Sequence, residues 1–183
     1  MENTKTAILV MDMQLSILGS LTEKETLIGN TARAIKAARE QQIPIIYVVV
    51  GFRQGIPEVG INNKVFSEFK KSLLNMDMQD WVKIHPGVAP QDGDIIITKR
   101  RFSAFTGSDL EVVLRGQGIQ HLILTGVSTS GVVLSTLREA ADKDYLLTVI
   151  SDCCADHDEE VHRVLMTKIF PRQANVVPLI EWI

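Results

Sequence analysis

The sequence predicts one α/β domain, a three-layer sandwich around a six-stranded, mostly parallel β-sheet of the Rossmann-like kind. Short apolar runs alternate with amphipathic segments along the 183 residues, as expected when helices connect parallel strands. Several runs are apolar without interruption, which is typical of strands buried on both faces of a sheet. Because there is no internal repeat, low-complexity segment or linker, we expect residues 1–183 to form a single domain.

The first half of the chain supplies two strands and two helices. An apolar run over 6–11 predicts a strand that ends at Asp12, and a second such run covers 44–50. Between them, residues 21–42 have helical periodicity, and Thr22 with Glu25 forms a capping-box pattern. Residues 51–63 predict a loop, residues 64–74 a helix, and residues 76–93 an irregular segment that serves as a flap or an oligomer contact.

The second half continues the alternation of strands and helices. Its predicted strands cover 94–98, 121–124, 145–150 and 175–177. Its predicted helices cover 110–115, 132–143 and 158–170. The third strand leads into Lys99, and the fourth leads through a turn of small residues, 125–131, into its helix.

Composition excludes several classes of partner. The net charge of −3, without any basic run, argues against nucleic acid or an anionic membrane. No apolar run reaches the ~20 residues of a membrane span. The two cysteines, Cys153 and Cys154, are neighbours, so we expect free thiols and a cytoplasmic location. The histidines and cysteines lack metal-ligand spacing, so we expect neither a metal nor a cofactor.

Candidate functional groups follow three of the predicted strands. In open parallel sheets ligands bind beyond the carboxyl ends of the strands, which is where Asp12, Lys99 and the turn over 125–132 should lie. Taken singly, an Asp at this position is more often a turn or helix-capping residue, and a Lys at the end of a strand is usually a solvated charge. The turn directs backbone N–H groups toward an incoming oxyanion. The usual position of a nucleophile in such a turn holds Val132, which has no reactive group.

These motifs resemble those of the isochorismatase-like superfamily, also called cysteine hydrolases. The turn T-G-V-S-T-S-G-V-V over 125–133 is similar to the family's T-G-[hydrophobic]-x-T-x-x-C-V. Asp12 lies in V-M-D-M-Q, similar to D-x-Q, and Lys99 begins K-R-R-F-S-A-F-T-G-S-D-L, similar to K-x-x-x-S-A-F-x-G-T-D-L. The resemblance covers 7–156 and implies the strand order 3-2-1-4-5-6. It also implies a catalytic Asp, Lys and Cys, of which the Cys is replaced by Val132.

The resemblance further implies roles for the residues around this triad. The turn residues Val127, Ser128, Thr129 and Gly131 would form the oxyanion site, with a cis peptide bond between Val127 and Ser128. The expected substrate contacts are Gln14, Phe52, Arg101, Phe105 and Ser130. For Phe105 and its neighbour Phe102, a place in the core is an equal alternative. The D-x-H metal pattern of nicotinamidases is missing.

Three functions remain open once a covalent step at Val132 is excluded. The first is hydrolysis of a small polar or carboxylated metabolite, with Asp12 as general acid or base and Lys99 or Arg101 as charge partner. The second uses a relocated thiol, Cys153 or Cys154, although a structural role is more common for such residues. The third is a non-catalytic member that binds a metabolite or a partner protein. We favour the first function, in a homo-oligomer, either a dimer or a tetramer.

Overall fold

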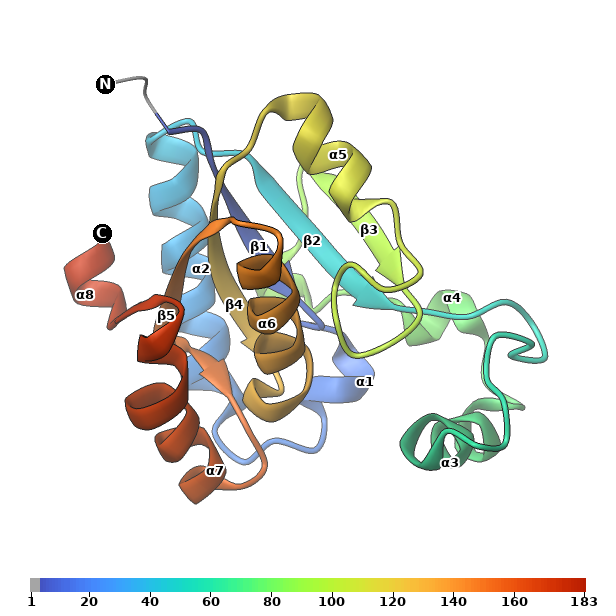
Figure 1. The fold of residues 1–183 in the computed structure, drawn as a ribbon. Coiled ribbons are helices and arrows are strands. Elements are labelled where there is room, and N and C mark those ends of the chain that lie inside the picture. Colours follow the sequence, from blue (N-terminus) through green and yellow to red (C-terminus); the bar gives the residue numbers. More distant parts are fainter. Residues whose placement is uncertain (1–3) are drawn as a thin grey trace.

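A six-stranded parallel sheet forms the centre of the computed structural model, which describes residues 4–183 (Figure 1). The strands are β1 (Thr6–Met11), β2 (Ile45–Val50), β3 (Ile95–Lys99), β4 (His121–Val127), β5 (Leu146–Ala155) and β6 (Asn175–Val177). Their order is β3-β2-β1-β4-β5-β6, and every neighbouring pair is parallel. The predicted fold class and strand order are therefore confirmed.

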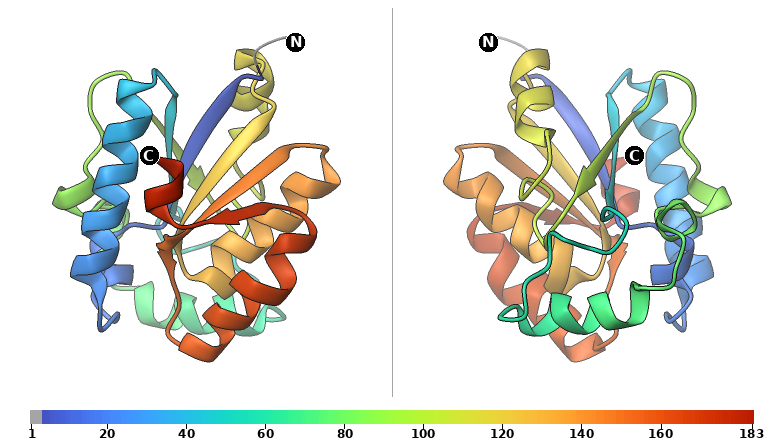
Figure 2. Two further views of the ribbon diagram at one scale, coloured as in Figure 1. Left: turned by 90° about the vertical axis from the view of Figure 1, so that its left-hand side faces the viewer. Right: turned by 90° about the vertical axis from the view of Figure 1, so that its right-hand side faces the viewer.

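Helices cover both faces of the sheet, which gives the three layers (Figure 2). The α-helices are α1 (Leu15–Leu18), α2 (Lys24–Glu40), α3 (Lys64–Leu73), α4 (Met78–Trp81), α5 (Leu110–Gln117), α6 (Leu134–Asp142), α7 (Glu159–Val164) and α8 (Leu179–Trp182). Helices α2 and α8 pack on one face, while α5, α6 and the segment that continues α7 pack on the other.

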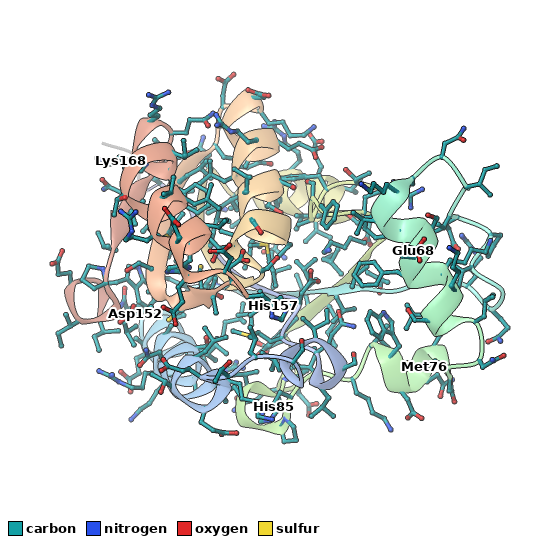
Figure 3. The ribbon with its side chains drawn as sticks, turned by 90° about the horizontal axis from the view of Figure 1, so that it is seen from below. Glu68, Met76, His85, Asp152, His157 and Lys168 are labelled. Atoms are coloured by element: carbon teal, nitrogen blue, oxygen red, sulfur yellow. The ribbon has the colours of Figure 1, made fainter. Side chains whose placement is uncertain are left out.

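Each face has its own apolar core, because alternate strand residues point to opposite faces. On one face, Ile8 and Val10 of β1 are buried with residues of α2. On the other, Leu9 and Met11 of the same strand are buried with residues of α5 and α6. A third cluster lies beyond the end of β2, where Phe52, Ile56 and Val59 pack with α3 and α4. Figures 1 and 3 show α3 projecting from the body of the domain.

Several element boundaries differ from the prediction. Strands β4 and β5 run on to Val127 and Ala155, so both cysteines lie inside β5 and not after it. Two residues of β5 in this extension, Ser151 and Asp152, are polar, which concealed its continuation. The predicted capping box is wrong, because α2 begins after Glu23 without a side-chain cap. The segment over 76–93 contains α4 and the 3-10 helix η1 (Pro86–Val88).

Candidate active site

A cavity of about 450 Å³ opens at the carboxyl edge of the sheet, the edge that Figure 3 views. Asp12 after β1, Lys99 at the end of β3 and the turn after β4 all line it. The sequence separates these groups widely, and the parallel register of β1 with β2 and β4 brings them together. The cavity is within the usual size range for small-molecule sites.

Asp12 and Lys99 form a buried ion pair in the wall of this cavity. Asp12 Oδ2 lies 2.9 Å from Lys99 Nζ, and the two residues are 5% and 1% exposed. The ammonium also donates to the backbone oxygen of Arg101 at 2.9 Å. The other carboxylate oxygen, Asp12 Oδ1, is buried and accepts no hydrogen bond within residues 4–183. Burial raises the pKa of Asp12 above its usual range, and Lys99 opposes this without reversing it.

The backbone at Asp12 turns sharply out of β1. Its φ is +55°, a left-handed conformation that Asp and Asn tolerate better than most residues. Its N–H donates to Val48 of the neighbouring strand at 2.8 Å. In this conformation Asp12 Oδ2 lies 2.9 Å from Lys99 Nζ.

Gln14 is a structural residue rather than the substrate contact we expected. It is completely buried, and its amide nitrogen donates to the backbone oxygens of Val50 and Trp81, at 3.2 and 2.7 Å. Its amide oxygen accepts from the N–H of Val50 at 2.8 Å. Through these hydrogen bonds, the Gln14 amide connects the chain after β1 to the end of β2 and to α4. Gln14 is not among the residues that line the cavity.

The turn after β4 has the form that the resemblance implied. The peptide bond between Val127 and Ser128 is cis, and the chain then enters a π-helix, η2 (Thr129–Val133), that continues into α6. Gly126 has a φ of +148°, and a Cβ there would collide with the carbonyl oxygen of Met11. Val127, Ser128, Gly131 and Val132 line the cavity.

Three N–H groups at the start of this turn already have partners. Ser130 N–H donates to the carboxylate of Asp156 at 2.6 Å. The N–H groups of Gly131 and Val133 donate to the backbone oxygen of Ser128, at 3.1 and 3.3 Å. The carboxylate of Asp156 therefore occupies the helix end that we expected to be open to an incoming oxyanion.

Position 132 presents an apolar side chain to the cavity. Val132 lines the same cavity as Asp12 and Lys99 and is only 1% exposed. A valine has neither a nucleophilic atom nor a hydrogen-bonding group. The geometry places a methyl surface where the resemblance implies a thiolate.

Four further predicted site residues lie outside the cavity lining. Phe105 packs in the core with its ring 6.1 Å from that of Tyr145. Arg101 donates to the backbone oxygens of Arg100 and Glu58, both at 2.6 Å. The remaining two belong to the turn: Thr129 is buried with its hydroxyl 2.8 Å from His162 Nδ1, and Ser130 is exposed. Of the expected substrate contacts, only Phe52 lines the cavity.

The structure adds wall residues that sequence reasoning did not identify. Phe66 and Phe69 of α3, Trp81 of α4, and His157 all line the cavity. Phe102, for which the cavity wall and the core were equal alternatives, also lines it. Figure 3 shows His157 near the centre of the carboxyl edge and Met76 toward α3 and α4. The helical periodicity of 64–74 indicated an apolar face on α3, but the sequence does not reveal that this face covers the site.

Neither cysteine reaches the cavity. Cys153 is completely buried in the core on the α2 face, and burial raises the pKa of its thiol to about 12. Cys154 is 5% exposed, and burial raises its thiol pKa even further. Cys154 lines a second cavity of about 400 Å³ together with Asp156, Glu159 and His162, and this cavity adjoins the first at Ser20 and His157. A buried thiol with a raised pKa is a poor nucleophile.

Within residues 4–183, no group of three or more His, Cys, Asp or Glu side chains is arranged to hold a metal ion. Within the same residues, no helix has the length and apolar character needed to cross a membrane.

Comparison with known proteins relates this geometry to a family. The model of the isochorismatase domain family matches residues 6–181. The chain is 30% identical over 168 residues to an uncharacterized isochorismatase family protein, YwoC of Bacillus subtilis, covering 92% of this chain and 87% of the relative. It is 30% identical over 175 residues to the ureidoacrylate amidohydrolase RutB of Stutzerimonas stutzeri, covering 83% of this chain and 70% of the relative.

Solved structures show the same architecture. An isochorismatase family protein from Burkholderia thailandensis superposes with a TM-score of 0.82 and is 27% identical. The match covers 98% of this chain and 94% of that one.

Proposed function

The chain belongs to the isochorismatase family, and from that premise we propose that it hydrolyses a small polar substrate without forming a covalent bond to the protein. Asp12 acts as the general acid or base, and Lys99 acts as its charge partner. The observation that carries the proposal is the buried Asp12–Lys99 pair, facing a cavity in which Val132 takes the place of a nucleophile.

The raised pKa of Asp12 suits a proton donor, because the acid form is then present at higher pH than for an ordinary carboxyl group. In an enol ether, the proton from Asp12 bonds to the terminal alkene carbon, and the alkene electrons form the new C–H bond. Water adds to the resulting oxocarbenium carbon and returns a proton to Asp12. The hemiketal then collapses to a carbonyl compound and an alcohol, so the overall reaction consumes one water molecule.

Lys99 has a supporting part in this scheme. Its ammonium, 2.9 Å from Asp12 Oδ2, stabilises the carboxylate that remains after proton donation. The side chain of Val132 adds apolar surface to the same cavity. A lower local polarity strengthens the interaction between Asp12 and Lys99.

Two alternative functions are a hydrolase with a relocated thiol and a non-catalytic binding protein. A relocated thiol would require Cys153 or Cys154 to reach the cavity, and their burial argues against it. A non-catalytic binding protein is the second candidate, favoured by the loss of a nucleophile at position 132.

Turnover of a substrate panel by the purified protein distinguishes these functions. The panel contains small amides, ureido compounds and enol ethers, including isochorismate, and a Cys153→Ala/Cys154→Ala variant is assayed in parallel. We expect equal turnover by both proteins. Loss of turnover in the folded cysteine variant would indicate a thiol mechanism. Absence of turnover by the wild type, with a copurified ligand in the cavity, would indicate a binding protein.

A further inference from the structure

Four phenylalanines and one tryptophan form the aromatic part of the cavity wall. Phe66 is central: its ring lies 6.1 Å from Phe52, 5.8 Å from Phe69 and 4.9 Å from Phe102, each in an edge-to-face arrangement. Trp81 adds a further ring to the lining. Edge-to-face clusters of this kind offer ring edges and faces to a planar apolar ligand.

The ionisable groups in the lining are few and largely paired. Among residues 4–183, Asp12, Lys99 and His157 are the ionisable side chains that line the cavity. Asp12 and Lys99 neutralise one another, and two of the three protons of the Lys99 ammonium point to Asp12 and to the Arg101 carbonyl. While Asp12 is ionised, the pair therefore offers an anionic substrate no positive charge in excess of its negative charge.

The nearby arginines do not supply that positive charge. Arg101, which we expected to bind a substrate carboxylate, lies over the Phe66 ring at 5.4 Å and donates to two backbone carbonyls. Arg100 donates to the Gly51 carbonyl at 2.7 Å and lies 3.5 Å from a carboxylate oxygen of Glu58. Neither arginine lines the cavity.

The helix end beside the cavity also disfavours an anion. The carboxylate of Asp156 already accepts from Ser130 N–H at 2.6 Å. A second carboxylate at this turn would be placed close to that negative charge, and like charges repel.

The pair still has capacity for a neutral polar group. Asp12 Oδ1 is buried and accepts no hydrogen bond within residues 4–183, and one proton of the Lys99 ammonium has no acceptor within the same residues. Together they match a ligand group that both donates and accepts a hydrogen bond. An uncharged amide or hydroxyl does this without the cost of burying an unpaired charge.

We propose that the cavity takes an uncharged small molecule with a planar apolar body, whose neutral polar group reaches Asp12 and Lys99. This narrows the substrate class of the proposed hydrolase and therefore rests on the same site. It differs from the carboxylated substrate that the sequence left open. The aromatic walls bind the body, and the ion pair binds the polar group.

Binding of benzamide and benzoate tests the proposal, because the two have the same shape and differ in charge. Trp81 lines the cavity and Trp182 does not, so fluorescence in a Trp182→Phe background reports on this site. We expect benzamide to bind at least about tenfold more tightly than benzoate. Benzoate binding as tight as benzamide, or no benzamide binding at millimolar concentration, would overturn the proposal.

A gain of charge at the rim provides a second test. Phe69 is 41% exposed and lines the cavity, so Phe69→Arg adds a free cation there. We expect this variant to bind benzoate at least about tenfold better than Phe69→Gln, which loses the ring without gaining charge. Val112→Arg on α5, where the residue is 74% exposed and remote from the lining, controls for net charge. Equal benzoate binding by Phe69→Arg and Phe69→Gln would contradict the proposal.

These binding measurements remain informative if hydrolysis is not found. Benzamide selectivity without turnover of any substrate supports the ligand class and rejects the catalytic proposal. Turnover of carboxylated substrates, accompanied by tight benzoate binding, supports hydrolysis and rejects the ligand class.

Discussion

Asp12 Oδ2 lies 2.9 Å from Lys99 Nζ, in a pair that is almost completely withdrawn from solvent at the carboxyl edge of the sheet. The two side chains come from strands that are not neighbours, since β2 lies between β1 and β3. The pair therefore depends on the correct register of three strands. Both the proposed chemistry and the local stability depend on this one contact.

Removal of Lys99 should destabilise the fold. Lys99→Met leaves the buried Asp12 carboxylate without its counter-ion, and we expect a loss of about 3–5 kcal/mol in the free energy of unfolding at neutral pH. The matching substitution at position 12 is Asp12→Asn, because Asn tolerates the φ of +55° at this position. In the Asp12→Asn/Lys99→Met variant the loss should be smaller than the sum of the single losses, as measured by urea denaturation. Additive losses would show that the pair contributes no coupling energy.

Turnover should decrease as the pH rises. Burial raises the pKa of Asp12, and the proposed reaction needs its acid form. Below this pKa, kcat/KM should be constant, and above it kcat/KM should decrease about tenfold per pH unit. The measurement is a pH–rate profile on a substrate that does not itself titrate. A rate that increases with pH would instead assign Asp12 the role of general base.

A thiol introduced at position 132 should become the reactive cysteine of the protein. Val132 lines the cavity beside the Lys99 ammonium, which lowers the pKa of a nearby thiol. Cys153 and Cys154 are buried, with raised thiol pKa values. We expect iodoacetamide at neutral pH to add one label to Val132→Cys and none to the wild type, as measured by intact mass. Labelling of Cys153 or Cys154 in the folded wild type would support the thiol mechanism.

Gly126 should be required for the fold of the turn. A Cβ at this position would overlap the Met11 carbonyl, and the φ of +148° strains any other residue. We expect Gly126→Ala to lose several kcal/mol of stability, on the order of 3 kcal/mol. Gly29→Ala is the matched control, because it lies within α2 with no atom near its added Cβ. This control should gain about 0.5–1 kcal/mol. Equal effects in thermal unfolding would contradict the steric argument.

The framework of this fold could be predicted from the sequence because its strands are continuous apolar runs. The run over 6–11 and the run over 121–124 required burial on both faces, and their ends identified Asp12 and the turn. The extension of β4 was concealed by a change of register against β5 between Leu124 and Gly126. Local patterning cannot reveal such an irregularity, because it depends on the partner strand.

The walls of the site could not be predicted in the same way. Phe69 and Trp81 come from helices whose sequence shows only an apolar face, and their contact with the cavity depends on tertiary placement. Arg101 and Phe105 both follow Lys99 closely in the sequence. Phe105 nevertheless packs in the core, and Arg101 lies over the ring of Phe66. Proximity in sequence to Lys99 was therefore a poor guide to the lining.

The most direct measurement is kcat/KM of Asp12→Asn on any substrate that the wild type hydrolyses. Asp92→Asn makes the same chemical change at an exposed position and serves as the control. We expect Asp12→Asn to lose at least about 100-fold in kcat/KM while remaining folded, and Asp92→Asn to match the wild type. Full turnover by folded Asp12→Asn would contradict acid–base catalysis by Asp12 and place the reacting group elsewhere.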